Sequence, residues 1–366
     1  MNHHSSFDTR PTAPVRARRL LSAVVATFAI VLGIAGAGAA TAAADTVIAT
    51  IPVGPSPFGV AITPDGSRAY VTNTAGVSVS VIDTATNTEI DTIGVGGGPF
   101  GVAITPNGTR AYVANLLGNS VSVIDTTNDT VVGAPIPVAN SPVGVAITPN
   151  GSFVYVTRVG TNLVSVIDTN TNMVVDTVTV ENGPFGVAIT PNGTRAYVAN
   201  ADDDTVSVVN TATNTVVGAP IPVGINPFLV AVTPDGSRVY VTNRNGNSVS
   251  VIDTGTDSVV DTITVGTLPE GVAVTPDGTR VYVTNSGGAS NSVSVIDTAT
   301  NMVIETIPVG LSPEGVAITP DGRRAYVTNR GEGTVSVIAI DQCPGSLCFD
   351  FGSLTGSGSG AGSVFS

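Results

Sequence analysis

Two glutamates occupy equivalent places in neighbouring copies of one repeated segment. Glu270 and Glu314 each follow a proline and precede Gly-Val-Ala. Two carboxyl groups that lie close together can act as general acid and general base, or can contribute oxygen ligands to calcium. Paired acidic residues are also common without any catalytic role. Repetition of the motif therefore favours two solvated side chains over an acid and base that meet at the mouth of a channel.

A run of three consecutive aspartates is the second group of acidic residues with chemical potential. Asp202, Asp203 and Asp204 follow Ala-Asn-Ala and precede an alternating segment. Calcium loops usually place their ligands at alternating positions, which a consecutive run does not do. We therefore interpret this run as an exposed acidic turn and keep it only as a weak candidate for a metal site.

The residue types that are absent restrict the chemistry further. The only histidines are His3 and His4, close to the amino terminus, and the chain contains no lysine and no tryptophan. Without histidine and lysine, the remainder of the chain lacks the usual base for serine or cysteine nucleophiles, the amine for Schiff bases and the imidazole ligands of haem, zinc or copper. We expect a protein without cofactors that is not an enzyme.

The elements that must position these residues are short strands in a repeated unit. Residues 59–66 and 68–73 form a predicted hairpin around a Pro-Asp-Gly turn, residues 79–81 alternate between valine and serine, and residues 90–93 begin a fourth strand. All seven tyrosines occupy the same point of the unit, 42–44 residues apart: Tyr70, Tyr112, Tyr155, Tyr197, Tyr240, Tyr282 and Tyr326. This period predicts an all-β, seven-bladed propeller of four-stranded antiparallel blades.

The two ends of the repeat array indicate how the ring closes. Residues 47–54 match the fourth-strand segment 303–310, whereas the last unit provides only three strands. We therefore expect the amino-terminal strand to complete the seventh blade, since this pairing removes two open sheet edges. The same interpretation predicts burial of the four large aliphatic side chains of that strand, which are Val47, Ile48, Ile51 and Val53.

The repeated units resemble a known family. Tyr-Val-Thr-Asn recurs at residues 70–73, 240–243, 282–285 and 326–329, with Arg158 replacing the asparagine in the third unit. This pattern looks like the YVTN family of β-propeller repeats, and the similarity covers residues 47–340. The resemblance implies a seven-bladed propeller of bacterial and archaeal surfaces or the periplasm. It implies no single activity.

The amino-terminal segment has the composition of an export signal. Four arginines precede an uncharged stretch that ends in Ala40-Thr-Ala42 and Ala42-Ala-Ala44, which are both small-x-small cleavage patterns. We predict a signal peptide over residues 1–44; the alternative is an uncleaved membrane anchor. The propeller would then occupy residues 45–342 of a secreted or cell-envelope protein without a stable membrane span.

The carboxyl-terminal segment is predicted to be a separate tail. Residues 343–366 are rich in glycine and serine, and Cys343 and Cys348 could form a small disulfide loop in an exported protein.

The charge of the chain argues against nucleic acid as a partner. Removal of residues 1–44 takes away one acid and four arginines, which changes the formal net charge from −13 to −16. Nucleic-acid binding depends on lysine and arginine to neutralise phosphates. An acidic, lysine-free surface therefore indicates a different class of partner.

One face of the propeller varies between units. The residue after the proline that begins each unit differs around the ring, in the order Phe58, Phe100, Val143, Phe185, Phe228, Glu270 and Glu314. Arg158, Arg244 and Arg330 belong to loops on the same face. We predict that this face recognises an envelope protein or glycan. The alternatives are hydrophobic capping by the phenylalanines, a carboxylate- or calcium-dependent lactonase-like hydrolase, and a structural surface-layer component.

Overall fold

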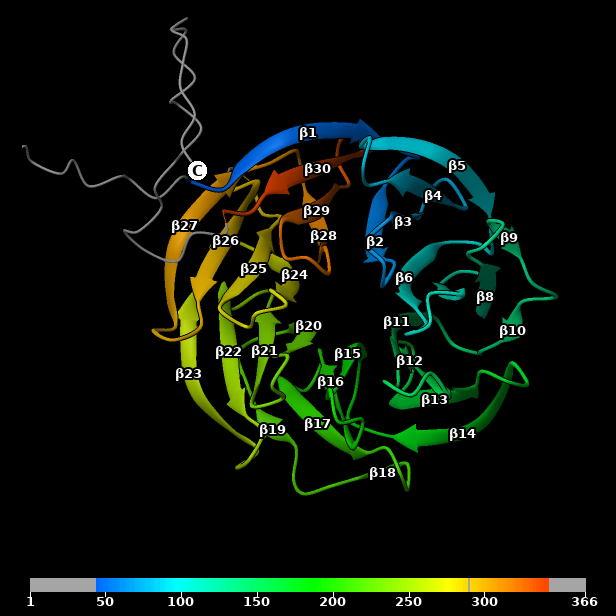
Figure 1. The fold of residues 1–366 in the computed structure, drawn as a ribbon. Coiled ribbons are helices and arrows are strands. Elements are labelled where there is room, and N and C mark those ends of the chain that lie inside the picture. Colours follow the sequence, from blue (N-terminus) through cyan, green and yellow to red (C-terminus); the bar gives the residue numbers. More distant parts are fainter. Residues whose placement is uncertain (1–43, 289, 342–366) are drawn as a thin grey trace, which may run out of the picture. The chain divides into compact units, whose positions relative to one another are not determined.

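The computed structural model describes residues 44–288 and 290–341, which belong to one compact unit. Seven antiparallel sheets surround a central axis, as Figure 1 shows. The predicted propeller is confirmed. The predicted signal peptide and the cysteine-containing tail lie outside the described residues, except for Ala44. Within the described ranges, no helix is long and apolar enough to cross a bilayer.

Each blade contains strands in the same order from the centre outwards. The innermost strands are β2 (Pro57–Ile62), β6 (Pro99–Ile104), β11 (Pro142–Ile147), β15 (Pro184–Ile189), β20 (Pro227–Val232), β24 (Pro269–Val274) and β28 (Pro313–Ile318). The second strands are β3 (Arg68–Asn73), β7 (Arg110–Asn115), β12 (Phe153–Arg158), β16 (Arg195–Asn200), β21 (Arg238–Asn243), β25 (Arg280–Asn285) and β29 (Arg324–Asn329).

The two outer positions complete each blade. The third strands are β4 (Ser78–Asp83), β8 (Ser120–Asp125), β13 (Leu163–Asp168), β17 (Thr205–Asn210), β22 (Ser248–Asp253), β26 (Ser292–Asp297) and β30 (Thr334–Ala339). The outermost strands are β5 (Thr88–Gly94), β9 (Thr130–Val131) with β10 (Ile136–Pro137), β14 (Met173–Thr179), β18 (Thr215–Val216) with β19 (Ile221–Pro222), β23 (Ser258–Thr264), β27 (Met302–Pro308) and β1 (Thr46–Pro52). A Gly-Ala-Pro segment interrupts the outermost strand in the second and fourth blades, because proline cannot donate to the ladder.

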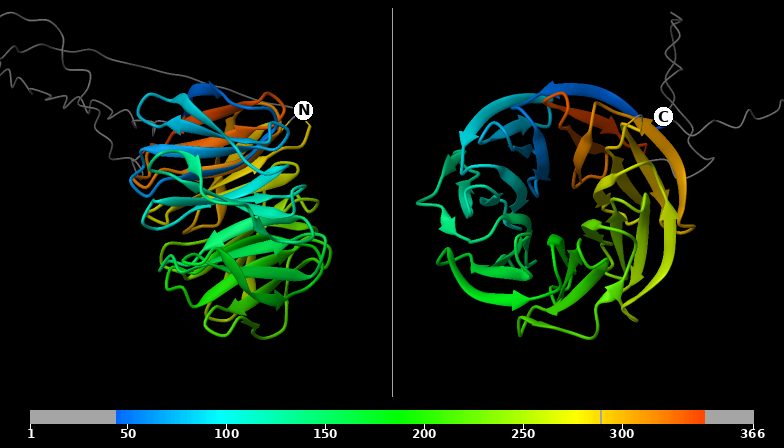
Figure 2. Two further views of the ribbon diagram at one scale, coloured as in Figure 1. Left: turned by 90° about the vertical axis from the view of Figure 1, so that its right-hand side faces the viewer. Right: turned by 180° about the vertical axis from the view of Figure 1, so that it is seen from behind.

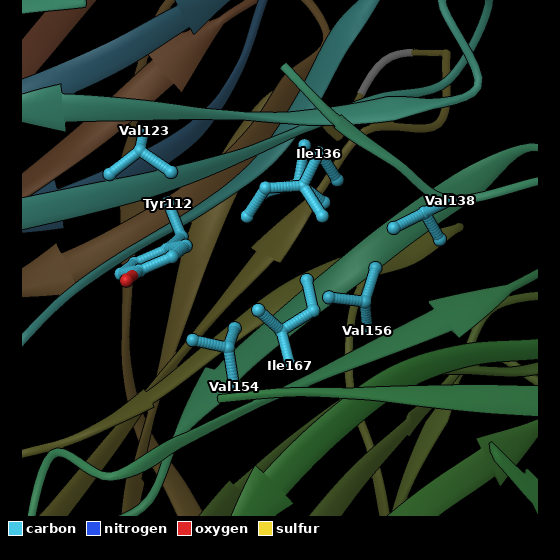
Figure 3. Close-up of a cluster of buried hydrophobic side chains, with 9 residues drawn as sticks. Tyr112, Val123, Ile136, Val138, Val154, Val156 and Ile167 are labelled. Carbon is cyan, nitrogen blue, oxygen red and sulfur yellow. The ribbon is translucent and has the colours of Figure 1, made fainter. Parts of the chain in front are cut away.

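The hydrophobic core lies between adjacent blades. Tyr112 and Val123 of the second blade pack against Val154, Val156 and Ile167 of the third, as Figure 3 shows. The valines that alternate with serine along each third strand therefore bury one face of a sheet against the next sheet. Equivalent clusters recur around the ring, so each blade is stabilised by its two neighbours.

The amino-terminal strand closes the ring. Strand β1 pairs antiparallel with β30, and Ile51 lies opposite Val335 (Figure 2). Ile51 is buried, but Val47 and Ile48 are exposed, so the prediction that the whole strand is buried was wrong. The first half of an outermost strand lies on the rim, where no neighbouring sheet covers it; β5 shows the same pattern.

Candidate functional site

Two sets of connections form each face of the propeller. The connection that enters an innermost strand is hydrogen-bonded to the connection between the second and third strands of the same blade. For example, the backbone nitrogen of Thr74 donates to the carbonyl oxygen of Ser56 at 3.0 Å. We call this side the loop face. The remaining connections bond to one another on the opposite side, as in Thr84 N to Ser67 O at 3.1 Å, and form the turn face. The residues predicted to bind a partner therefore share the loop face.

Four phenylalanine rings meet at the centre of the loop face. The ring centroids of Phe58 and Phe100 lie 3.6 Å apart, and those of Phe185 and Phe228 lie 3.9 Å apart. Edge contacts of 5.5 Å between Phe100 and Phe185 and of 6.3 Å between Phe58 and Phe228 connect the two pairs. Val143 is buried beside them. These five residues, which we call the apolar cap, pack together as the capping interpretation predicted; a binding role stays a prediction.

Close backbone contacts fix the apolar cap in place. A Cβ atom on Gly144 would lie 2.3 Å from the carbonyl oxygen of Phe185 in the next blade, so only glycine fits there. The Thr157 hydroxyl donates to the same carbonyl. The cap and the innermost strands enclose a cavity of about 130 Å³, which is lined mainly by valines and glycine backbone. The centre of the ring is therefore apolar.

Glu270 and Glu314 complete the ring of residues around the cap. They are 1% and 5% exposed, so the expectation of solvated side chains was wrong. They occupy the ring position that carries an apolar side chain in the other five units, and that position faces the protein interior. Glu270 Oε1 accepts hydrogen bonds from Arg244 Nε at 2.6 Å and from the Ser286 hydroxyl at 3.1 Å. Arg330 Nη1 lies 3.5 Å from Glu314 Oε1.

The environment of the two glutamates favours protonation of Glu314. Burial, followed by the adjacent Glu270 carboxylate, raises the pKa of Glu314 to about 8. The other carboxylate oxygen of Glu270, Oε2, is buried and accepts no hydrogen bond from any other residue of the described chain. Burial and a neighbouring like charge both disfavour the ionised carboxylate, so Glu314 favours its protonated form near neutral pH. We call the two residues the acid pair.

The predicted arginines divide into two groups. Arg244 pairs with Glu270 and lies over the Phe228 ring, 5.5 Å from its centroid, so it connects the acid pair to the apolar cap. Arg330 lies beside Glu314. Arg158 belongs to the third blade, across the ring, and its buried Nε makes no hydrogen bond within the described ranges. The structure therefore brings two of the three arginines to the acid pair.

The three consecutive aspartates brace neighbouring loops. Asp203 Oδ2 accepts from the backbone nitrogen of Asn182 at 2.8 Å, and Asp204 Oδ1 accepts from that of Asn226 at 2.7 Å. Asp202 is exposed. Among residues 44–288 and 290–341, no group of three or more histidine, cysteine or acidic side chains is placed to hold a metal ion. The run lies in a turn, with Asp202 and Asp204 exposed and Asp203 half-buried.

Sequence reasoning missed an apolar rim around the cap. Four large aliphatic side chains project from loop-face connections: Val77, Leu117, Ile225 and Leu311. Leu117 is 76% exposed and Ile225 is 58% exposed. The signal was available, because each of the four is a large aliphatic residue beside a glycine or an asparagine in a short connection.

Comparisons with known proteins agree with the fold. Residues 60–219 match the family described as lactonase, 7-bladed beta-propeller, and residues 235–324 match the YNCE-like beta-propeller family. A solved structure of Kuenenia stuttgartiensis hydrazine synthase is similar, with 27% identity and a TM-score of 0.71 over 78% of this chain and 96% of that chain. A search of curated proteins gave no match. The chain is thus similar to YNCE-like and lactonase-type propellers, while the closer resemblance to YVTN repeats stays a prediction.

Proposed function

We propose that the chain is a non-enzymatic binding scaffold at the cell envelope, which recognises a partner through its loop face. The supporting observation is the apolar rim around the apolar cap. No large exposed apolar side chain of the described residues lies on the connections of the turn face. An exposed apolar patch bordered by polar groups is typical of an interaction site, and central apolar contacts contribute most of the binding energy.

The chemistry of this surface favours a protein over a glycan. Sugars bind proteins by stacking on free aromatic faces, but the cap stacks Phe58 on Phe100 and Phe185 on Phe228. Leu117 and Ile225 offer aliphatic surface without hydrogen-bonding groups, which suits apolar side chains of another protein. The acidic, lysine-free composition disfavours nucleic acid.

Binding of envelope fractions to the immobilised protein tests the proposal. The double variant Leu117→Ser with Ile225→Ser should lower the affinity for a captured protein by at least about 30-fold, since a central apolar contact is typically worth about 2 kcal/mol. The matched control is Ile90→Ser, which changes an exposed isoleucine on β5, away from the loop face. Equal affinity of the unmodified protein, the double variant and the Ile90→Ser control would contradict the proposal. Capture of a glycan with an affinity that the double variant retains would also contradict it.

A lactonase-like hydrolase is the second candidate, because the pKa of Glu314 is raised beside a second carboxyl in the acid pair and residues 60–219 match the lactonase family. Ester hydrolysis needs a base to activate water and an acid to protonate the leaving oxygen. Here, substrate would first have to displace Arg244. Lactone hydrolysis that falls by about 100-fold or more in Glu314→Gln would support this candidate, and no hydrolysis by the unmodified protein would remove it. Ordered self-assembly without a partner would instead favour a surface-layer component.

A further inference from the structure

The point where the ring closes differs from the other junctions between blades. At six junctions, the tyrosine hydroxyl of one blade reaches toward an asparagine or aspartate in the outer turn of the next blade, and these turn residues have positive φ: Asn87, Asp129, Asn172, Asn214, Asp257 and Asn301. The seventh blade has no such turn, because its outermost strand comes from the amino terminus. There, Tyr282 donates to the side chain of Asp45 instead.

Asp45 also replaces a second contact of the missing turn. At two other junctions the turn asparagine donates through Nδ2 to an aspartate of the preceding blade, Asn214 to Asp176 and Asn301 to Asp261, each at 2.9 Å. At the closure, the backbone nitrogen of Asp45 lies 3.3 Å from Glu305 Oε2. The main-chain nitrogen of Asp45 thus occupies the place that a side-chain NH2 group occupies elsewhere.

The nitrogen of Asp45 lies among acidic side chains. Asp45 is 4% exposed, and its carboxylate accepts from the backbone nitrogen of Asp341 at 2.7 Å. Arg280 Nη1, at 3.4 Å, is the one cation that pairs with Asp45 in the described structure. Burial raises the pKa of Glu305, and the negative charges of Asp45 and Asp341 add to this effect. Arg280 thus pairs with the Asp45 side chain, while the Asp45 nitrogen lies against the Glu305 carboxylate, so a positive charge on this nitrogen would stabilise a partly buried carboxylate.

We infer that the chain is cut between Ala44 and Asp45, and that the new α-ammonium group of Asp45 forms an ion pair with Glu305. A protease that accepts small residues one and three positions before the cut would use Ala44 and Ala42. Water adds across the peptide bond, leaving a carboxylate on Ala44 and an ammonium group on Asp45. A cut after Ala42, or no cut, would leave an uncharged amide nitrogen beside Glu305.

The first test locates the cut. The full chain is produced in an exporting bacterium, and the amino terminus of the recovered protein is determined by intact mass and sequencing. The protein should begin at Asp45. A protein that begins at Ala43, begins anywhere else or retains residues 1–44 would overturn the inference. This outcome is independent of partner binding, so it does not depend on the proposed function.

The second test measures the ion pair itself. The sequence contains no lysine, so the α-amine is the only amine that an acylating reagent can modify. The pH midpoint of labelling should lie above the ordinary α-amino range of about 7.7–8.0, because the carboxylate of Glu305 favours the charged amine. Glu305→Gln should lower this midpoint by about one unit, which makes the free amine about tenfold more abundant near neutral pH.

Asp261→Asn provides the matched control. Asp261 occupies the same register on β23 as Glu305 does on β27, opposite Val251 and Val295 respectively. This variant should leave the labelling midpoint unchanged. Equal midpoints for the Glu305→Gln variant and the control would overturn the ion pair. If the Glu305→Gln variant does not fold, a labelling midpoint of the unmodified protein within the ordinary α-amino range would also overturn the ion pair.

Discussion

The acid pair should make the stability of the ring fall as the pH rises above neutral. Burial and the adjacent Glu270 raise the pKa of Glu314 from 4.5 to about 8, so its favourable protonation is fully present below 4.5 and is lost as the pH approaches 8. Between pH 6 and 9 this loss amounts to about 2.5 kcal/mol of unfolding free energy. In a propeller of this size, that difference lowers the melting temperature by roughly 4 °C.

Urea unfolding of the unmodified protein and of Glu314→Gln at several pH values measures this effect. The glutamine resembles the protonated carboxyl, so the variant should lose most of the fall in stability between pH 6 and 9. The control is Glu332→Gln, which changes an exposed glutamate of the same blade and should retain the fall. The described residues contain no histidine or lysine, which leaves this pH range clear of most other titrations. A fall of the same size in Glu314→Gln would refute the raised pKa of Glu314.

Two further predictions concern the scaffold. Ile51→Ala should lower the free energy of urea unfolding by about 2–5 kcal/mol, because Ile51 is buried at the closure. Ile48→Ala, on the exposed part of the same strand, should lower it little. Equal losses would mean that β1 does not seal the ring. Gly144→Ala should lower the melting temperature by many degrees because its Cβ would collide with the Phe185 carbonyl, whereas Gly94→Ala, with nothing within 4 Å, should be tolerated; similar melting temperatures would contradict the close packing.

The fold could be predicted from the sequence because the repeat is visible in single residue types. Tyrosine marks the same point of every unit, a Pro-Asp-Gly or Pro-Asn-Gly turn marks another, and the unpaired fourth-strand segment at residues 47–54 indicates how the ring closes. The burial of that strand was less predictable. A rim strand exposes part of both faces, so aliphatic residues such as Ile48 need not be covered.

The sequence predicted the location of the candidate site but not the burial of its glutamates. The spacing of the units placed Glu270 and Glu314 in one ring, but their burial depends on how closely seven innermost strands approach the axis. Comparison between units contained the missing information. A position that carries phenylalanine or valine in five of seven units is a buried position, and a glutamate there must find a proton or a cation.

At the cap, the departures from an apolar residue followed by glycine lie in three neighbouring blades, and this arrangement affects how a partner could bind. Leu229 replaces the glycine of the other units in the fifth blade, and the acid pair replaces apolar residues in the sixth and seventh. The other four blades present only apolar residues at the cap. Seven similar blades would by themselves offer a partner seven nearly equivalent orientations. This ring is apolar on one arc and carries Arg244 paired with a buried carboxylate on the other. It therefore offers a partner one orientation, because a mismatched charge or an unpaired polar group penalises each rotated position.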